Sequence, residues 1–600
     1  MSAVLKQNAC ECPSPEEMAS TYAEVARRAS HLIGEHIQRQ LQKGIQTPSD
    51  ELGIAQAFMD MMARLLSNPY KLAQAQMSLV WDYFALWQQS MLRFAGMHPA
   101  PVVTPSSSDK RFRDEQWQEH FMFDFIKQSY LIAARHVHET VNGIEGLDGQ
   151  TAKKVSFYTR QYIDALSPSN FAITNPEVFR ETVHCNGQNL IKGLNNLLRD
   201  IEDGNGSLRV RMTDTSAFEL GKNVATTPGK VVFQTDMMQL IQYQPSTDKV
   251  FKRPVLIVPP WINKFYILDL REKNSFIKWL VDQGQTVFVI SWVNPDERLS
   301  EKSFESYMKE GIFAAIDAIE KQTGEKEVNA IGYCLGGTLL AITAAYLAHK
   351  KQKRIASATF LTTLTDFSEP GELGVFIDEG QISNLEKKMF LRGFLEGSEM
   401  AGTFNMLRAN DLIWSFVVNN YLMGRNPFPF DLLYWNSDST RLPAKMHSFY
   451  LRKMYMENKL IEPGGIEFDG VPIDLGKINV PCFFISTIED HIAPWKSTYM
   501  GAVRFTAPVR FILGGSGHIA GVVNPPAANK YGYWINPTAK LAPTADEWLS
   551  GAEQCEGSWW VNWQEWATGH NNAKTDARDP AKGTLEALDD APGSYVKFRL

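Results

Sequence analysis

Residues 328–348 read VNAIGYCLGGTLLAITAAYLA, in which an apolar run leads through Gly-x-Cys-x-Gly-Gly into an Ala- and Leu-rich stretch. The first part has the composition of a buried strand, and the last part is typical of a helix. This order of strand, tight turn and helix is a nucleophile elbow, with Cys334 where a serine often stands. Gly332 and Gly336 lack a Cβ, so strand and helix can cross closely around a strained nucleophile. The sequence therefore predicts a reactive thiolate at a helix N-terminus.

Other short runs rich in β-branched and aromatic residues surround this segment. Amphipathic helices, such as 275–283 and 303–323, lie between several of them. Strand–helix alternation favours a mostly parallel sheet with helices on both faces, that is, an α/β fold. The predicted strands are 230–235, 254–258, 286–291, 328–332, 356–362, 480–486 and 509–513.

An elbow nucleophile needs a general base and an acid that orients it, and the acid precedes the histidine in the chain. Asp490 follows the predicted strand 480–486, and His518 stands in a glycine-flanked loop after the strand 509–513. Both positions lie at the carboxyl end of a strand, where such a fold presents its base and its orienting acid. We therefore predict Cys334, Asp490 and His518 as the catalytic residues.

Alternatives remain at these positions. Buried cysteines are commonly inert, although the strand, glycines and helix around Cys334 favour a nucleophile. Glu489 and His491 flank the predicted acid, and His491 is a candidate auxiliary residue because adjacent side chains point apart. Cys10 and Cys12 lack partners at the spacing of a metal site, so we expect no metal.

The composition is that of a globular protein without a general attraction to nucleic acid. Of the 600 residues, 44% are hydrophobic and 21% are charged, and the formal net charge is −7. The dispersed cysteines favour a reducing compartment over a disulfide framework. Residues 1–17 lack the apolar core of a signal peptide, and no apolar run approaches the ~20 residues that span a membrane. We therefore expect a cytoplasmic protein without a transmembrane segment.

The sequence changes character twice along the chain. Residues 1–108 form a variable helical N-terminal region and a linker rich in proline and serine, and residues 109–225 form a second helical part. Residues 226–600 carry the strand–helix alternation. Within them, about 369–466 lack this alternation and are rich in aromatic residues, which we interpret as a lid inserted over the site. The predicted N-terminal helices are 16–42, 54–66, 70–97, 112–145, 151–166 and 176–200.

Motifs from Asp109 onward together resemble class I polyhydroxyalkanoate (PHA) synthases, also called poly(3-hydroxyalkanoate) polymerases. The resemblance covers nearly the whole chain from that residue, and it is weakest in the preceding helices. The motifs are 167–177 (SPSNFAITNPE), 254–270 (PVLIVPPWINKFYILDL), 289–295 (VISWVNP), 332–337 (GYCLGG), 489–494 (EDHIAP) and 557–560 (GSWW).

The resemblance implies a helical N-terminal domain, an α/β-hydrolase-fold catalytic domain with a lid, and the same triad. It implies that the protein is an acyltransferase that polymerises (R)-3-hydroxyacyl-CoA, such as short-chain 3-hydroxybutyryl-CoA, into polyester. Coenzyme A is then a product, and no further cofactor is expected. The backbone N–H of Leu335 is expected to stabilise the oxyanion, with a second donor in the loop 259–263, such as Ile262. The sequence leaves open whether Asp490 or His518 activates the 3-hydroxyl.

The resemblance also implies a homodimer on the surface of cytoplasmic PHA granules, bound to the growing chain and accompanied by phasin-type proteins. Two other functions remain open. The first is a Cys-dependent thioesterase or PHA depolymerase, and the second is a non-catalytic granule-coat protein.

Two apolar features bear on these alternatives. Trp559, Trp563 and Trp566 recur at helical spacing, which favours packing of a C-terminal helix on the core over a binding platform. The helices 54–66 and 70–97 carry methionine and aromatic residues over a wide arc. Core packing and a hydrophobic surface for a partner, a granule or a like subunit explain that arc equally well.

Overall fold

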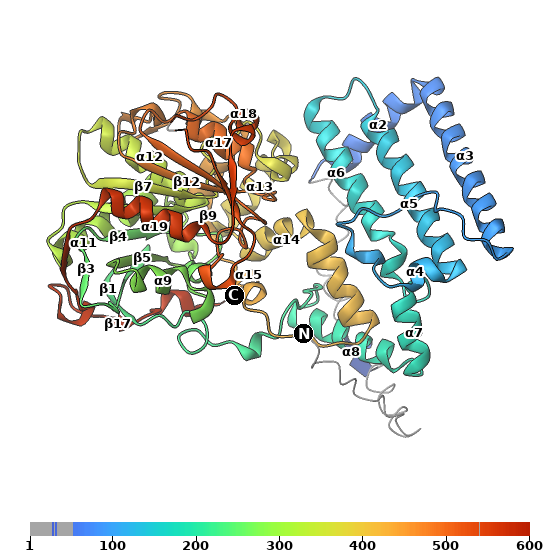
Figure 1. Cartoon of the computed structure of the whole chain (residues 1–600), viewed down its shortest axis with the longest axis horizontal. Helices are drawn as coiled ribbons and strands as arrows, with labels where there is room; N and C mark the ends of the chain where they lie inside the picture. Colours follow the sequence, from blue (N-terminus) through green and yellow to red (C-terminus); the bar gives the residue numbers. More distant parts are fainter. Residues whose placement is uncertain (1–26, 29, 33–51, 539, 600) are drawn as a thin grey trace. The chain divides into compact units, whose positions relative to one another are not determined.

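The computed structural model describes residues 27–28, 30–32, 52–538 and 540–599 (Figure 1). Most of the predicted helix 16–42, together with Cys10 and Cys12, lies outside these residues. The chain divides into two compact units, each of which is described by itself. One unit holds the residues up to Asp214 and Phe404–Phe428, and the other holds Thr215–Thr403 and the chain from Pro429 onward.

The first unit is helical, and the helices on both sides of the proline-rich linker pack within it. Some of its helices begin at side-chain caps that the sequence encodes. The Asn68 side chain accepts the Lys71 N–H, and Asn175 caps the helix whose first residue is Pro176. The helices are α2 (Ile54–Leu66), α3 (Pro69–Phe94), α4 (Gln116–Glu119), α5 (Phe121–Asn142), α6 (Gly149–Ala165), α7 (Pro176–His184) and α8 (Gln188–Asp203).

Two helices that the sequence predicted as continuous are each broken. The segment 112–145 leaves helical geometry at His120, between α4 and α5. The segment 176–200 is interrupted at Asn186 and Gly187, whose φ angles are 48° and 80°. Asparagine and glycine tolerate this left-handed conformation, so the pair ends α7 before α8 begins. The prediction of one long helix in each place was therefore wrong.

The second unit is built on a large twisted sheet, and every strand predicted from the sequence is present in it (Figure 1). Its central strands pair in parallel and its outer strands pair antiparallel. In spatial order the strands are β15 (Glu553–Cys555), β14 (Tyr533–Ile535), β13 (Val509–Gly514), β12 (Cys482–Thr487), β7 (Ile355–Leu361), β6 (Val328–Tyr333), β4 (Val255–Val258), β5 (Val287–Trp292), β2 (Met238–Tyr243), β1 (Gly229–Gln234) and β17 (Asp589–Asp590).

Successive side chains of the central strands enter hydrophobic cores on opposite faces of the sheet. Leu256 and Val258 of β4 join the core that contains much of α12, whereas Val255 and Ile257 join the core that contains the tryptophans of α19. The helices of this unit are α9 (Phe276–Asp282), α10 (Phe304–Ser306), α11 (Ala314–Thr323), α12 (Leu335–His349), α13 (Glu379–Arg392), α14 (Gly397–Leu407, whose last turn belongs to the first unit), α15 (Asp431–Asn436), α16 (Ala444–Phe449), α17 (Trp495–Val503), α18 (Ala545–Ser550) and α19 (Trp559–His570).

Small two-stranded pairings complete the second unit: β10 (Glu467–Phe468) with β11 (Val471–Pro472), β3 (Lys249–Phe251) with β16 (Lys574–Asp576), and β8 (Phe394–Leu395) with β9 (Leu442–Pro443). The segment Tyr450–Met456 continues α16 as a π-helix. Segments of this kind are rare and are frequent at functional sites. No helix in the described part of the chain has the length and hydrophobicity that a membrane crossing needs.

Candidate active site

Cys334 stands at the sharp turn between β6 and α12, as the elbow motif predicts. Its φ of 51° and ψ of −120° are strained for a residue with a Cβ. Its N–H donates to the carbonyl of Leu361 on β7 at 2.9 Å, and its carbonyl accepts the N–H groups of Gly337 and Thr338. These bonds hold the strained conformation at the N-terminus of the buried helix α12.

The elbow glycines are required by close backbone crossings. A Cβ on Gly332 would lie 2.4 Å from the Cα of Gly337, and a Cβ on Gly336 would lie 2.1 Å from the carbonyl oxygen of Val258. Neither neighbour is a movable side-chain end. The crossing of β6, α12 and β4 therefore permits only glycine at both positions.

Asp490 and His518 follow the neighbouring parallel strands β12 and β13, whose ends are in register at Thr487 and Gly514. This places the two side chains at the same edge of the sheet. The Asp490 Oδ2 and His518 Nδ1 atoms are 2.6 Å apart, and both residues are buried. The Asp490 Oδ1 atom accepts the N–H groups of Ile492 and Ala493, both at 2.9 Å, so the carboxylate is held by its own loop.

The pKa of His518 depends on the charges of both Asp490 and Cys334. Burial by itself lowers the pKa of His518, but the charges of Asp490 and Cys334, with hydrogen bonds to both, raise it to about 10. The hydroxyl of Tyr333 donates to the His518 carbonyl at 3.2 Å, and the two rings stack. An imidazolium held between a carboxylate and a sulfur favours the thiolate form of that sulfur.

The expected oxyanion donors belong to the first turn of α12 and to the loop after β4. Leu335 is the first residue of α12, where a backbone N–H has no acceptor within its own helix. In the loop after β4, the Ile262 carbonyl accepts the Thr440 N–H at 3.0 Å. In the same loop, the Trp261 indole N–H is buried without a hydrogen-bond partner among the described residues, and sequence reasoning did not single it out.

Two tyrosines from the π-helical segment also lie in the electrostatic neighbourhood of Cys334. Burial raises the pKa of Tyr450 and Tyr455, and the negative charge of Cys334 raises both further. Their rings contact one another and Phe367. The sequence carried no sign of this, because the tyrosines lie inside the inserted segment and no motif links them to the elbow.

The predicted lid is divided between the two units. Of the aromatic residues of this segment, Trp414, Phe416 and Phe428 belong to the helical unit. Trp435 belongs to the second unit, where its buried indole donates to the Lys264 carbonyl at 2.7 Å. His491, the possible auxiliary, is half-buried beside Asp490. Among the residues that the structure describes, no cluster of His, Cys, Asp and Glu side chains is arranged to hold a metal ion.

Comparison with known proteins identifies the family. Residues 108–280 match the family model of the poly-beta-hydroxybutyrate polymerase (PhaC) N-terminus. A curated poly(3-hydroxyalkanoate) polymerase subunit PhaC from Rhizobium meliloti is 52% identical over 534 residues, covering 89% of this chain and 87% of its own. The chain belongs to the poly(3-hydroxyalkanoate) polymerase family. It is therefore an enzyme of the acyltransferase type.

A second curated relative and a fold model agree with this assignment. The poly(3-hydroxyalkanoate) polymerase subunit PhaC of Cupriavidus necator is 40% identical over 547 residues, covering 90% of this chain and 91% of its own. Residues 254–525 match the α/β-hydrolase fold model, so the polymerase has the predicted fold class. A hydrolase structure from Pseudomonas aeruginosa aligns over 50% of this chain and 95% of its own, at 13% identity and a TM-score of 0.30.

Proposed function

We propose that this chain polymerises (R)-3-hydroxyacyl-CoA, with short-chain units such as 3-hydroxybutyryl-CoA, into polyester through a thioester on Cys334. The observation that carries the proposal is the strained Cys334 turn, electrostatically coupled to the hydrogen-bonded Asp490–His518 pair. The names of the curated relatives support the polymer product.

In the first half-reaction, His518 accepts the Cys334 proton, and Asp490 holds the imidazole in the required tautomer. The thiolate attacks the carbonyl carbon of the acyl-CoA thioester and forms a tetrahedral oxyanion. The backbone N–H of Leu335 stabilises that oxyanion together with a donor from the loop after β4, for which the Ile262 N–H and the Trp261 indole are the candidates. Collapse breaks the bond to the coenzyme A sulfur, which leaves with the proton from His518.

In the second half-reaction, the 3-hydroxyl group of another 3-hydroxyacyl unit attacks the carbonyl carbon of the acyl thioester. An ester bond forms, the bond to the Cys334 sulfur breaks, and Cys334 leaves as a thiolate. The proton of the hydroxyl passes to His518, directly or with the assistance of Asp490, and the chain grows by one unit. Transfer between two thioesters is nearly isoenergetic, so the enzyme-bound acyl group stays activated for ester formation. Water at the same position would turn the reaction into thioester hydrolysis, and the buried Tyr450 and Phe367, with the partly buried Tyr455, exclude it.

The covalent bond between the polyester and Cys334 in this proposal implies where the enzyme is found in the cell. A polyester chain attached to Cys334 becomes insoluble as it grows, so the enzyme is carried with it to the surface of a cytoplasmic granule. A homodimer and phasin-type granule proteins remain parts of the proposal that rest on the resemblance. Separation of granules from a cell lysate tests the location, since the enzyme should sediment with the polymer only when Cys334 is intact.

The decisive experiment compares wild type with Cys334→Ala and with Cys555→Ala, which removes the cysteine of edge strand β15. Each protein is incubated with 3-hydroxybutyryl-CoA while coenzyme A release and turbidity are followed together. Cys334→Ala should lose at least about a thousandfold in coenzyme A release, because a missing nucleophile is not replaced by the other members of a triad. Cys555→Ala should keep wild-type turnover. Full residual turnover of Cys334→Ala would refute the assignment.

The same experiment separates the alternative functions. A thioesterase releases coenzyme A and soluble 3-hydroxy acid without turbidity. A PHA depolymerase releases soluble acid from added polymer. A granule-coat protein releases no coenzyme A, and its Cys334 is not labelled by an acyl-CoA analogue.

A further inference from the structure

Arg452 joins the π-helical segment Tyr450–Met456 to the helix α13. Its Nε and Nη2 atoms donate to the two carboxylate oxygens of Glu386 at 2.7 and 2.6 Å. Its Nη1 and Nη2 atoms donate to the two oxygens of Glu379 at 2.9 and 3.1 Å, and Nη2 also lies 3.4 Å from the Ser383 hydroxyl oxygen. These three partners lie on successive turns of α13. One guanidinium therefore binds along one face of that helix.

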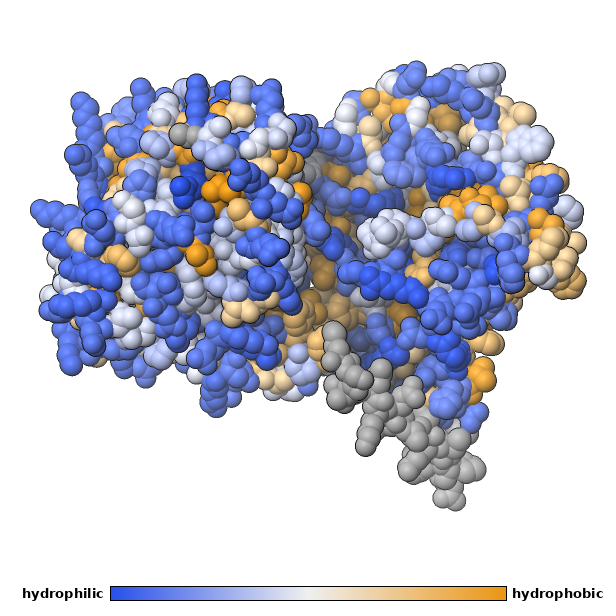
Figure 2. Space-filling view, in the orientation of Figure 1, coloured by the Kyte–Doolittle hydropathy of each residue, from blue (hydrophilic) through white to orange (hydrophobic). Residues whose placement is uncertain are grey.

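These bonds differ from isolated ion pairs at the surface of the second unit. Hydrophilic side chains predominate on the face of this unit that Figure 2 shows, and a pair such as Lys496–Asp546, with side chains 57% and 74% exposed, contributes little in water. The side chains of Arg452 and Glu386 are each only 27% exposed, and their two parallel bonds fix both distance and orientation. The Ser448 hydroxyl of α16 also donates to Glu386. The contact therefore holds α16 and the π-helical segment on α13.

The tyrosines of the same segment have other neighbours. Tyr450 is buried in the core that contains Leu335, the first residue of α12. The rings of Tyr450 and Tyr455 contact each other at 5.1 Å between centroids, and they contact the Phe367 ring at 6.1 and 4.9 Å. Phe367 lies in the loop that follows β7. The tyrosines therefore pack against that loop, while Arg452 bonds to α13.

The loop after β7 is bonded both to the elbow helix and to the end of the π-helical segment. The Leu364 carbonyl accepts the Thr338 hydroxyl at 2.7 Å, one turn along α12 from Cys334. The Phe367 N–H donates at 2.8 Å to the side chain of Asn458, which follows the π-helical segment. A displacement of the segment therefore acts on a loop that supports the elbow.

π-Helical winding is rare, so contacts with other elements must hold this segment in it, and the bonds of Arg452 to α13 are such contacts. We propose that Arg452 is a positioning residue, which holds Tyr450 and Tyr455 in the wall of the acyl-enzyme site and thereby excludes water from the thioester. This role rests on the proposed thioester mechanism, since it concerns the partition of one acyl-enzyme between a hydroxyl group and water. Without the bonds to α13, the tyrosines lose their fixed place beside the loop that supports the elbow.

The test incubates each full-length protein with 3-hydroxybutyryl-CoA and measures soluble 3-hydroxybutyrate per coenzyme A released. This ratio reports loss of the acyl group to water, and a smaller folded fraction lowers both products without changing it. The variants are Arg452→Gln, Glu386→Gln and the double variant Arg452→Gln/Glu386→Gln. Lys453→Gln is the matched control, because Lys453 is the next residue of the same segment and pairs with Glu457 at 2.7 Å.

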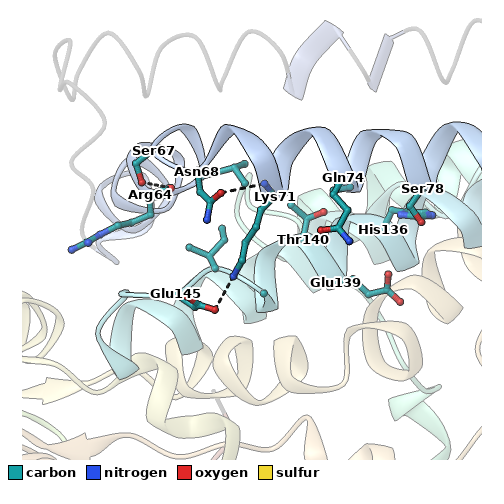
Figure 3. A pocket seen from close by; sticks show the side chains of 14 residues that line it. Arg64, Ser67, Asn68, Lys71, Gln74, Ser78, His136, Glu139, Thr140 and Glu145 are labelled. Atoms are coloured by element: carbon teal, nitrogen blue, oxygen red, sulfur yellow. Dashed lines mark hydrogen bonds and ion pairs between the residues drawn. The ribbon is translucent and has the colours of Figure 1, made fainter.

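A second control removes an ion pair of the helical unit. Lys71 pairs with Glu145 at 2.7 Å, and both line a polar pocket of about 500 Å³ that α2, α3 and α5 border (Figure 3). Lys71→Gln removes this pair without touching the second unit, so it shows whether loss of an ion pair elsewhere in the chain affects the ratio.

Arg452→Gln should raise the ratio by about tenfold or more, because displacements of about 1 Å in a site change rates by as much as about a hundredfold. Glu386→Gln should raise it as well, and the double variant should not exceed Arg452→Gln, since both substitutions remove one contact. Both lysine variants should keep the wild-type ratio. Amide hydrogen exchange of residues 450–458, measured without substrate, should be about tenfold faster or more in Arg452→Gln and unchanged in Lys453→Gln.

An unchanged ratio in Arg452→Gln, or an equal rise in Lys453→Gln, would overturn the proposal. Unchanged hydrogen exchange in Arg452→Gln would overturn it even if the wild type made no polymer, so failure of the positioning role is distinguishable from failure of the proposed function. If circular dichroism shows that Arg452→Gln is unfolded, Glu386→Gln decides, because its glutamine can still accept the Ser448 hydroxyl. A wild-type ratio and wild-type exchange in that variant would then overturn the proposal.

Discussion

Around His518, a carboxylate and a sulfur make protonation of the imidazole favourable in a buried site. The pKa of this histidine is about 10, against an ordinary 6.5. A raised folded-state pKa means that protonation stabilises the fold. That contribution is fully present below about pH 6.5 and is lost as the pH rises through about 10.

We therefore expect the free energy of unfolding of wild type to exceed that of His518→Gln by an amount that shrinks between pH 6.5 and pH 10. Urea unfolding at a series of pH values measures the difference. Asp490→Asn should move this loss of stability to lower pH, because it removes the largest interaction that raises the pKa. A difference that stays constant across the range would contradict the coupling.

The site residues could be predicted from the sequence where the catalytic residue and the glycines that its backbone conformation requires are close together in the chain. Gly332, Cys334 and Gly336 lie within one turn, and the crossing of strand and helix explains all three. The electrostatic link of Tyr450 to Cys334 and the buried, unpaired Trp261 indole could not be predicted, because both depend on contacts between segments that are distant in the chain.

At the level of elements, the central strands were predictable because strands buried on both faces are continuously apolar. All residues of β6 are buried, for example. The strand β2 was missed, since its sequence MQLIQY carries two glutamines. Both glutamines are buried and bonded: Gln239 donates to Gln234 and Ser594, and Gln242 donates to the carbonyl of Arg578. Hydrogen bonds to residues distant in the chain therefore allow a segment with two glutamines to form a buried strand.

The interpretation of the tryptophans of α19 as core residues is confirmed, and it leads to a stability prediction. Trp563 is fully buried, and its indole donates to the Thr359 hydroxyl on β7 at 2.9 Å. Trp563→Ala should lower the free energy of unfolding by about 3–5 kcal/mol through the cavity it leaves. Val561→Ala, at an exposed position on the same helix, should change it by less than about 0.5 kcal/mol. Similar values from chemical unfolding of the two variants would contradict this role.

Across the second unit, a buried lysine ties the end of the chain to the loop beside the elbow. The Lys264 ammonium donates to Asp438 Oδ1 at 2.6 Å and to the carbonyls of Val596 and Phe598 at 2.9 and 2.7 Å. The other oxygen of Asp438 accepts the Tyr266 hydroxyl at 2.9 Å. The loop with a candidate oxyanion donor is therefore held by residues from two distant segments, one at Asp438 and one at the end of the chain.

Lys264→Met should destabilise the fold by about 3–5 kcal/mol, because it leaves the Asp438 carboxylate buried without its cation. The double variant Lys264→Met/Asp438→Leu should recover part of that loss, since no buried charge remains. Thermal unfolding of the two variants and of wild type measures which of them is the more stable. The interpretation is wrong if the single variant is as stable as wild type or if the double variant is the less stable of the two.

The π-helical segment Tyr450–Met456 has a consequence for how the residues near Cys334 can change. Such a segment holds one residue more than an α-helix of the same number of turns, and the extra residue is accommodated within it. Deleting one residue of the segment therefore restores regular winding while the chain on either side keeps its place. Only side chains inside the segment, Tyr455 among them, then point in new directions. A change of one codon thus redirects these side chains without displacing the rest of the helix.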